Sequence, residues 1–203
     1  MALLTRFYRN ESGVAFMEFA FALPLFLILL MGVIETTNFV YANQKAESAA
    51  TNILNIITLQ NEVSTAQLAD MSSMLPEIIR PFEVSLDEYK VIVTTMERPL
   101  GVPFGYVRWQ KEFGGAPGDS KFDFVDGGTR AENKVKPAQV NNFAFVPGDQ
   151  IVYVESYFHY TPVLDVQLMR DILGLENDSY LYHVTAPARP RANTLRRDPD
   201  DAG

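Results

Sequence analysis

The sequence predicts an α+β fold in which a long N-terminal helix and a short second helix precede an antiparallel β-sheet. Three observations support this prediction. An apolar run long enough for a membrane helix lies near the N-terminus, and apolar residues then recur at helical spacing up to about residue 79. From Tyr89 onward the spacing of apolar residues changes to two, which is typical of strands. Helices that precede strands in this way favour segregated α and β layers.

The apolar run from Val14 to Ile34 is predicted to form a transmembrane helix over residues 14–35. At the rise of an α-helix it reaches about 31 Å, enough to cross the hydrocarbon core of a bilayer. Residues 1–13 form a leader in front of it. The run exceeds a usual signal-peptide core, and no small-x-small cleavage site follows it. These features favour a retained membrane segment over a removed secretory signal.

The charges that flank this segment predict its orientation. Arg6 and Arg9 precede it, whereas the residues after it carry the acidic excess of the chain. Positive residues beside a short N-terminal segment stay in the cytoplasm. We therefore expect a cytoplasmic N-terminus and a periplasmic domain over residues 36–192, with its globular part at 64–192.

Composition excludes several classes of function. The net charge is −8 and the isoelectric point about 4.8, which argues against nucleic acid as a partner. The chain contains no cysteine, and so has no disulfide, thiolate metal site or cysteine nucleophile. Outside the membrane segment roughly 150 residues remain, enough for one domain with its own core.

The transmembrane helix is predicted to continue over residues 36–59. No proline or glycine interrupts this stretch, and apolar residues recur in steps of three and four, at Phe39, Ala42, Ala46, Ala49, Ile53 and Ile56. Such a stripe favours a face packed on the protein core, and contact with other subunits is the alternative. The small alanines permit close approach of another helix or of a sheet.

A second helix is predicted over residues 65–79. Ser64 and Gln67 have the spacing of a capping box at its start. Leu68, Met71, Leu75 and Ile78 or Ile79 would form its apolar face. Pro76 falls inside the pattern and is expected to kink or end the helix.

Four strands are predicted, with loops between them. The strands cover residues 88–97, Tyr106–Glu112, Gln150–Thr161 and Tyr180–Ala188. The glycine-rich residues 114–128 are interpreted as a surface loop, and Val163–Leu173 as a short helix. Residues 193–203 are charged and interrupted by proline, which predicts a disordered tail.

No pattern of catalytic, cofactor-binding or metal-binding residues emerges. His159 and His183 lack further ligands at metal-site spacing, so partly exposed sheet positions are favoured for both. Asp119, Asp123 and Asp126 offer oxygen ligands for calcium, but their spacing is not that of an EF-hand, and a solvated loop is favoured. Nucleophile elbows, phosphate loops and dinucleotide glycine patterns are missing from the sequence. A basic cluster near the end is interpreted as a solvated tail, and comprises Arg189, Arg191, Arg196 and Arg197.

Three stretches carry a resemblance to a known family. The first runs from Gly13 through Glu18-Phe19 and Leu23-Pro24 to Gly32-Val-Ile-Glu35. The second is the aromatic-rich Tyr157-Phe-His-Tyr-Thr-Pro-Val-Leu, and the third is Val184-Thr-Ala-Pro-Ala-Arg-Pro-Arg. Together they resemble the TadE/TadF-like minor pilins, or pseudopilins, of tight-adherence (Flp-type IV) pilus systems. The resemblance implies a pilin-like fold.

The resemblance also implies processing and assembly. A prepilin peptidase would cut after Gly13, which makes Val14 the new N-terminus and Glu18 and Phe19 the fifth and sixth residues. Glu18 would then pair with the amino group of an adjacent subunit inside lipid. The implied partners are other pilins, the peptidase, the inner-membrane assembly platform and the lipid bilayer. The implied location is the bacterial inner membrane, from which the protein would enter an extracellular pilus.

Alternative interpretations remain at these positions. Gly13 would merely precede a helix, and Glu18 would extend toward the cytoplasmic interface. Pro24 would be an ordinary transmembrane proline, or would loosen the helix so that it leaves the membrane. At the level of function, the alternatives are an uncleaved, anchored periplasmic scaffold or sensor, and an anchored enzyme. No residue pattern supports the enzyme.

Overall fold

The computed structural model describes residues 12–60, 62–82, 85, 87–136, 146–162 and 180–190. The chain divides into two compact units. The first contains Met1–Val40 and Pro162–Glu176, and the second contains Tyr41–Thr161 and Asn177–Gly203. The helix predicted at Val163–Leu173 and the tail predicted at 193–203 lie outside the described residues.

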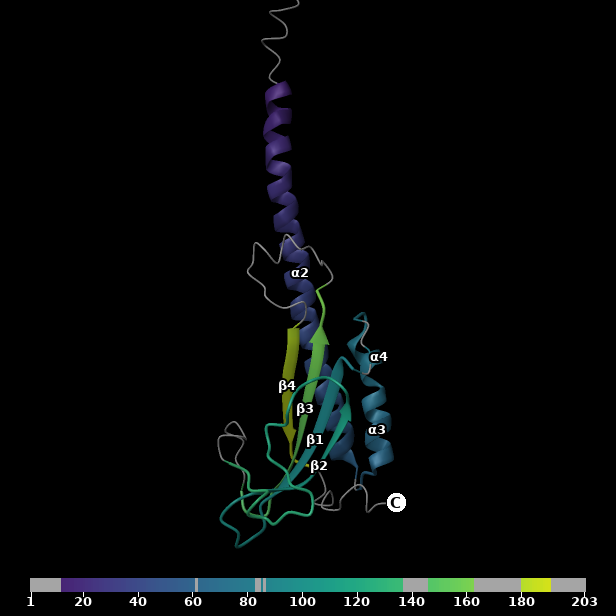
Figure 1. Ribbon diagram of the computed structural model, residues 1–203, viewed down its shortest axis with the longest axis vertical. Coiled ribbons are helices and arrows are strands. Elements are labelled where there is room, and N and C mark those ends of the chain that lie inside the picture. Colours follow the sequence, from purple (N-terminus) through teal and green to yellow (C-terminus); the bar gives the residue numbers. More distant parts are fainter. Residues whose placement is uncertain are drawn as a thin grey trace, which may run out of the picture. The chain divides into compact units, whose positions relative to one another are not determined.

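Helix α2 extends without interruption from Ser12 to Leu59 (Figure 1). It confirms the prediction of one continuous helix through the apolar run and beyond it, and Pro24 lies in its interior. It is long and apolar enough to cross a membrane, with a mean hydropathy of 2.4 over its most apolar window. Just after the apolar run, the hydroxyls of Thr36 and Thr37 donate hydrogen bonds to the backbone carbonyls one turn earlier. Neither hydroxyl is therefore left without a hydrogen-bond partner.

The part of α2 in the second unit buries a stripe of small and branched side chains. This stripe comprises Ala42, Ala46, Ala49, Ala50, Ile53, Leu54 and Ile57. The predicted stripe is wrong at its two ends, because Phe39 and Ile56 are each 39% exposed. After Ile53 the buried face continues four residues on, at Ile57, because a helix advances 3.6 residues per turn and the stripe drifts around it.

The predicted second helix is divided into α3 (Thr65–Ser73) and α4 (Leu75–Ile79). Ser64 accepts a hydrogen bond from the Gln67 backbone N–H, and the Gln67 side chain accepts one from the Ser64 N–H, so the capping box is confirmed. The break at Met74 follows from Pro76, which lacks an N–H and crowds the preceding turn.

The sheet is antiparallel throughout, in the order β2-β1-β3-β4. Its strands are β1 (Tyr89–Glu97), β2 (Tyr106–Gly114), β3 (Gln150–Tyr160) and β4 (Tyr180–Ala188). These bounds agree with the predicted strands to within two residues: β2 continues two residues further, and β1 and β3 are each one residue shorter. Helices followed by an antiparallel sheet confirm the α+β, pilin-like fold class.

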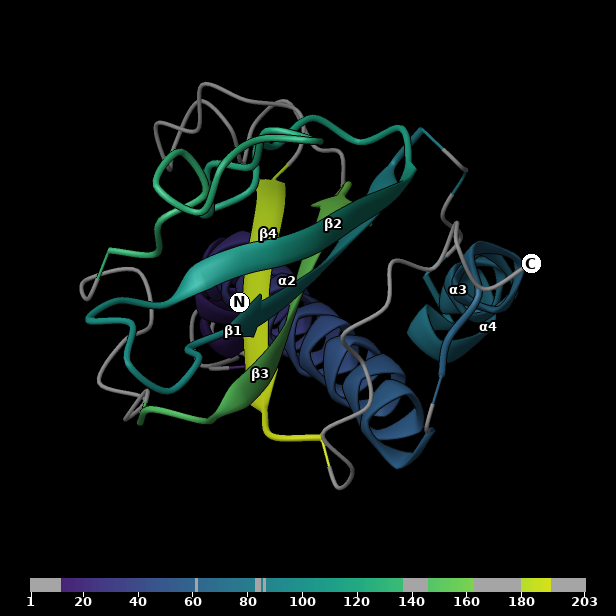
Figure 2. The ribbon, with the colours of Figure 1, turned by 90° about the horizontal axis from the view of Figure 1, so that it is seen from below.

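Both faces of the sheet are covered. One face packs on the second-unit part of α2 and on α3 and α4, as Figure 2 shows from the end of the sheet. On the opposite face, Ala116 and Phe122 from the segment after β2 are buried against strand residues such as Tyr153 and Tyr157. Residues 115–128 lie at the surface without helix or strand, as predicted, and in addition the buried side chains of Ala116 and Phe122 make them a cover for the sheet.

Candidate assembly segment

All five residues predicted to act in processing and assembly lie on the first part of α2. They are Gly13, Val14, Glu18, Phe19 and Pro24. Gly13 lies in the first helical turn, not in extended backbone. A Cβ atom added to it would meet no atom within 4 Å, so space does not require glycine here.

Val14 and Glu18 are four residues apart on a regular helix, which places them on the same face one turn apart. Both are exposed, as is Phe19, at 60%. Among the described residues no ion pair forms with Glu18. Within the described residues, the segment therefore presents a carboxylate on an exposed apolar surface.

Pro24 interrupts the backbone hydrogen bonds of α2 without ending the helix. Proline lacks an N–H, so the bond to the carbonyl of Ala20 is lost while the helix continues on both sides. In lipid such a carbonyl needs a donor from elsewhere, for instance a neighbouring helix.

A comparison with protein families bears on this segment. The family model described as TadE-like protein matches residues 13–53. The N-terminal segment of this chain is therefore similar to the TadE-like family. The match begins at Gly13, contains all five predicted residues and ends within the buried stripe of α2. It covers about a fifth of the chain, and the sheet lies outside it. Neither a curated protein nor a solved structure matches the chain.

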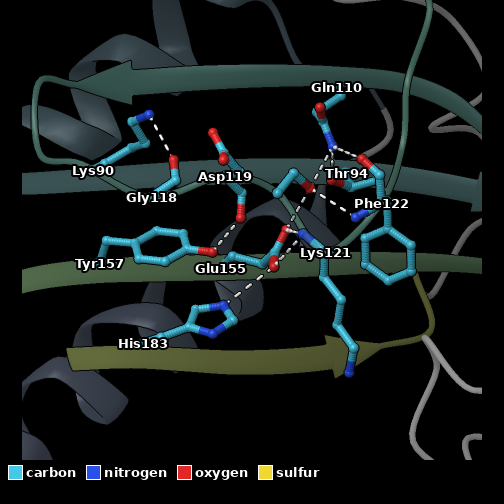
Figure 3. A network of polar contacts seen from close by, with 11 residues as sticks. Lys90, Thr94, Gln110, Gly118, Asp119, Lys121, Phe122, Glu155, Tyr157 and His183 are labelled. Carbon is cyan, nitrogen blue, oxygen red and sulfur yellow. Dashed lines mark hydrogen bonds and ion pairs between the residues drawn. The ribbon is translucent and has the colours of Figure 1, made fainter. Parts of the chain in front are cut away.

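A buried carboxylate in the sheet is the polar feature that sequence reasoning missed. The side chain of Glu155, in the middle of β3, is fully buried. It accepts hydrogen bonds from the Ser120 hydroxyl at 2.6 Å and from the Lys121 backbone N–H at 3.0 Å (Figure 3). His183 Nε2 on β4 lies 3.2 Å from Glu155 Oε1, the oxygen that also accepts from Lys121. Glu155 thus joins the covering loop to two strands.

Tyr157 continues this polar network along β3. Its ring stacks on His183 with centroids 4.4 Å apart, and its hydroxyl donates to the carbonyl of Asp119. Burial, and then the nearby charges of Glu155, Asp119 and Glu112, raise the pKa of Tyr157 to about 12. Because each bond ends on the loop or on β4, the network fixes the loop to the sheet.

The arrangement around Glu155 does not resemble a catalytic one. Ser120 and His183 each bond to the carboxylate, so the histidine does not act on the serine hydroxyl. Among the described residues no three potential metal ligands come together. His159 is half-buried and the His183 side chain is 38% exposed, which confirms the predicted partly exposed sheet positions.

The charged residues of the loops separate into two groups. Asp119, Asp123 and Asp126 are exposed, as predicted for a solvated loop, and Asp123 pairs with Lys136 at 3.3 Å. Arg189 differs from its prediction as part of a solvated tail, because it forms an ion pair with Asp149 at 3.0 Å. This ion pair holds Arg189, the first residue after β4, beside Asp149. The rest of that cluster, Arg191, Arg196 and Arg197, lies outside the described residues.

Proposed function

We propose that this protein is a minor pilin or pseudopilin of a tight-adherence type IV pilus, processed after Gly13. Similarity to the TadE-like family supports a protein associated with a Tad pilus, and the apolar α2 is consistent with a single-pass membrane anchor. The observation that carries the proposal is the family match, which begins at Gly13 and contains Glu18. Over the matched residues α2 is an unbroken helix, and it exposes most of its apolar side chains from Val14 to Ile34.

The proposed processing step breaks the peptide bond between Gly13 and Val14. This bond lies in the first turn of α2, whose N–H groups have no partners within the helix. Unwinding that turn therefore costs few hydrogen bonds, and glycine offers the least obstruction to a peptidase at the membrane surface. Hydrolysis leaves a free ammonium on Val14.

The proposed assembly step uses Glu18. In one chain Val14 and Glu18 lie a turn apart and both are exposed, so each is available to the same helix segment of a neighbouring subunit. An ammonium of one subunit beside the Glu18 carboxylate of the next lowers the cost of holding either ion in lipid. The role is structural, and its partners are other pilins, the peptidase, the assembly platform and the lipid bilayer.

The variant Gly13→Ala tests processing. An alanine Cβ meets no atom within 4 Å, so loss of processing would reflect recognition and not misfolding. Intact masses are compared for wild type, Gly13→Ala and the neighbouring control Ser12→Ala, all expressed in the native host. We expect wild type and the control to lack residues 1–13, and Gly13→Ala to remain full length. Full-length wild-type protein would refute the proposal.

An uncleaved, membrane-anchored scaffold or sensor is the second candidate. It is favoured by the second unit, which has its own apolar core and buried polar network and needs no partner subunit for either. This candidate predicts that the mature protein retains Arg6 and Arg9. The same mass measurement separates the two functions.

A further inference from the structure

A pocket of about 260 Å³ opens in the second unit where β1 ends and β3 begins. Arginine is the most frequent residue in its wall. The lining residues are Glu97, Arg98, Pro99, Arg108, Arg130, Gly148 and Asp149. Backbone hydrogen bonds join two sides of the wall just beyond the ends of β1 and β3, from Gly148 N–H to Arg98 O and from Arg98 N–H to Asp149 O.

Both carboxylates of the wall are already bound within the protein. Glu97 accepts a hydrogen bond from the hydroxyl of Tyr106, and Arg108 lies 3.8 Å away. Asp149 accepts hydrogen bonds from Arg189 at 3.0 and 3.1 Å. These contacts neutralise the two acids, so the arginines determine the charge that a ligand would meet.

Arg130 is the arginine best placed for a ligand. Its guanidinium lies 5.1 Å from the centroid of the Tyr106 ring, and stacking on a ring face uses none of its N–H donors. The residue is exposed, and no ion pair with it forms among the described residues. In a chain of net charge −8, this wall carries more guanidinium than carboxylate groups.

Exposed apolar side chains flank the pocket. Leu100 is 80% exposed and Val146 is 51% exposed. The loops that carry them meet at Gly148, where an added Cβ would lie 3.8 Å from Leu100 Cδ2. Arginine beside exposed apolar side chains is typical of protein interfaces, whereas a site for a free ion needs no apolar flank.

We propose that this pocket binds a carboxylate from an acidic and partly apolar peptide segment of a protein partner. The carboxylate pairs with Arg130 within the pocket, and apolar side chains of the segment cover Leu100 and Val146. Arginine forks match carboxylate geometry, and the apolar flank favours a peptide carboxylate over a free anion. This binding goes beyond the proposed function and does not depend on cleavage after Gly13.

Fluorescence anisotropy tests the proposal with the full chain in detergent micelles. The probe is a labelled short peptide of alternating Leu and Asp, and its uncharged match replaces each Asp by Asn. We expect the acidic peptide to bind at least tenfold more tightly than its match. Arg130→Gln should weaken binding about tenfold, and Leu100→Ser should also weaken it. The control Arg80→Gln, which removes a guanidinium from an exposed pair with Glu77, should leave binding unchanged.

Several results would overturn the proposal. One is equal binding of the two peptides, which would indicate apolar attraction alone. Another is an Arg130→Gln variant that binds like wild type while its circular dichroism and melting are unchanged. Binding of citrate that depends on Arg130, with no binding of the peptide, would assign the pocket to a free small anion instead. Uncleaved Gly13→Ala protein should bind the acidic peptide as wild type does, so this proposal and the processing proposal can fail separately.

Discussion

Gly118 lies directly against the ring of Tyr157 in the loop that covers the sheet. Its φ of +137° suits glycine alone, and an added Cβ would lie 2.5 Å from the ring. We expect Gly118→Ala to lower the free energy of unfolding by about 2 kcal/mol or more. Gly127 is the matched control, because its φ is +67° but a Cβ would meet no atom within 4 Å. Gly127→Ala should cost about 1 kcal/mol. Equal losses in denaturant titrations of both variants would contradict the close approach.

The phenol of Tyr157 gives a pH dependence at the residue scale. Its pKa is about 12 in the folded protein, because burial and nearby carboxylates disfavour the phenolate. The contribution of this raised pKa to the free energy of unfolding is fully present below pH about 10, the ordinary pKa of tyrosine. It is lost as the pH rises through about 12. An ultraviolet difference titration of wild type against Tyr157→Phe should show a midpoint near 12. A midpoint near 10 would show that the phenol meets solvent.

Single residues differed in how well the sequence predicted them. The helical positions of Val14, Glu18 and Pro24 follow from an uninterrupted apolar run, which is a local pattern, whereas Gly13 was expected in the leader and lies in the helix. The hydrogen bonds of Glu155 do not follow from a local pattern, because their donors, Ser120 and Lys121, are more than thirty residues away in the sequence. A carboxylate within the apolar strand Ile151–Tyr160 was the available sign of a buried acid.

At the scale of elements, the alanine stripe of α2 sets how closely this helix packs on the sheet. Ala46 is fully buried, whereas Ser48 on the same helix is exposed and its hydroxyl bonds to a carbonyl of that helix. We expect Ala46→Leu to lower the free energy of unfolding by about 1–3 kcal/mol, since extra methylenes overpack the contact. The control Ser48→Leu also enlarges a small side chain, but at an exposed position, and should change it by less than about 0.5 kcal/mol. Thermal and denaturant unfolding of the two variants measures the difference. Similar losses in both would place the buried face elsewhere.

Elements were predicted well where one local rule dominates. The capping box at Ser64 and the proline at 76 gave the start and the break of α3 and α4. Alternation of apolar residues gave the strands to within about two residues. The prediction that Phe39 and Ile56 belong to the buried stripe was wrong. Where the buried face of a helix ends depends on how far the sheet extends beside it, and that contact is not encoded locally.

At the scale of the whole molecule, the cover on the outer face of the sheet was the main surprise. Glycine and aspartate in residues 114–128 indicated a solvated loop, and the aspartates are indeed exposed. The loop nevertheless buries Phe122 and Ala116 and supplies partners to Glu155. Which face a long loop covers depends on strand order, and single-sequence patterns do not encode it.

The lack of cysteine allows a test of the proposed membrane orientation. Ser73→Cys places one exposed thiol at the end of α3, in the second unit. In the uncleaved Gly13→Ala background, an impermeant maleimide should label it in spheroplasts without permeabilisation. Thr5→Cys in the leader is the matched control, and should react only after permeabilisation. The reverse pattern would contradict a cytoplasmic N-terminus.

The central claim concerns the whole molecule as it exists in its host, and the N-terminal residue of protein purified from native membranes tests it most directly. The account predicts Val14 as the first residue, with its ammonium one helical turn from Glu18. A chain that begins at Met1 or Ala2 would contradict processing and would favour the anchored scaffold.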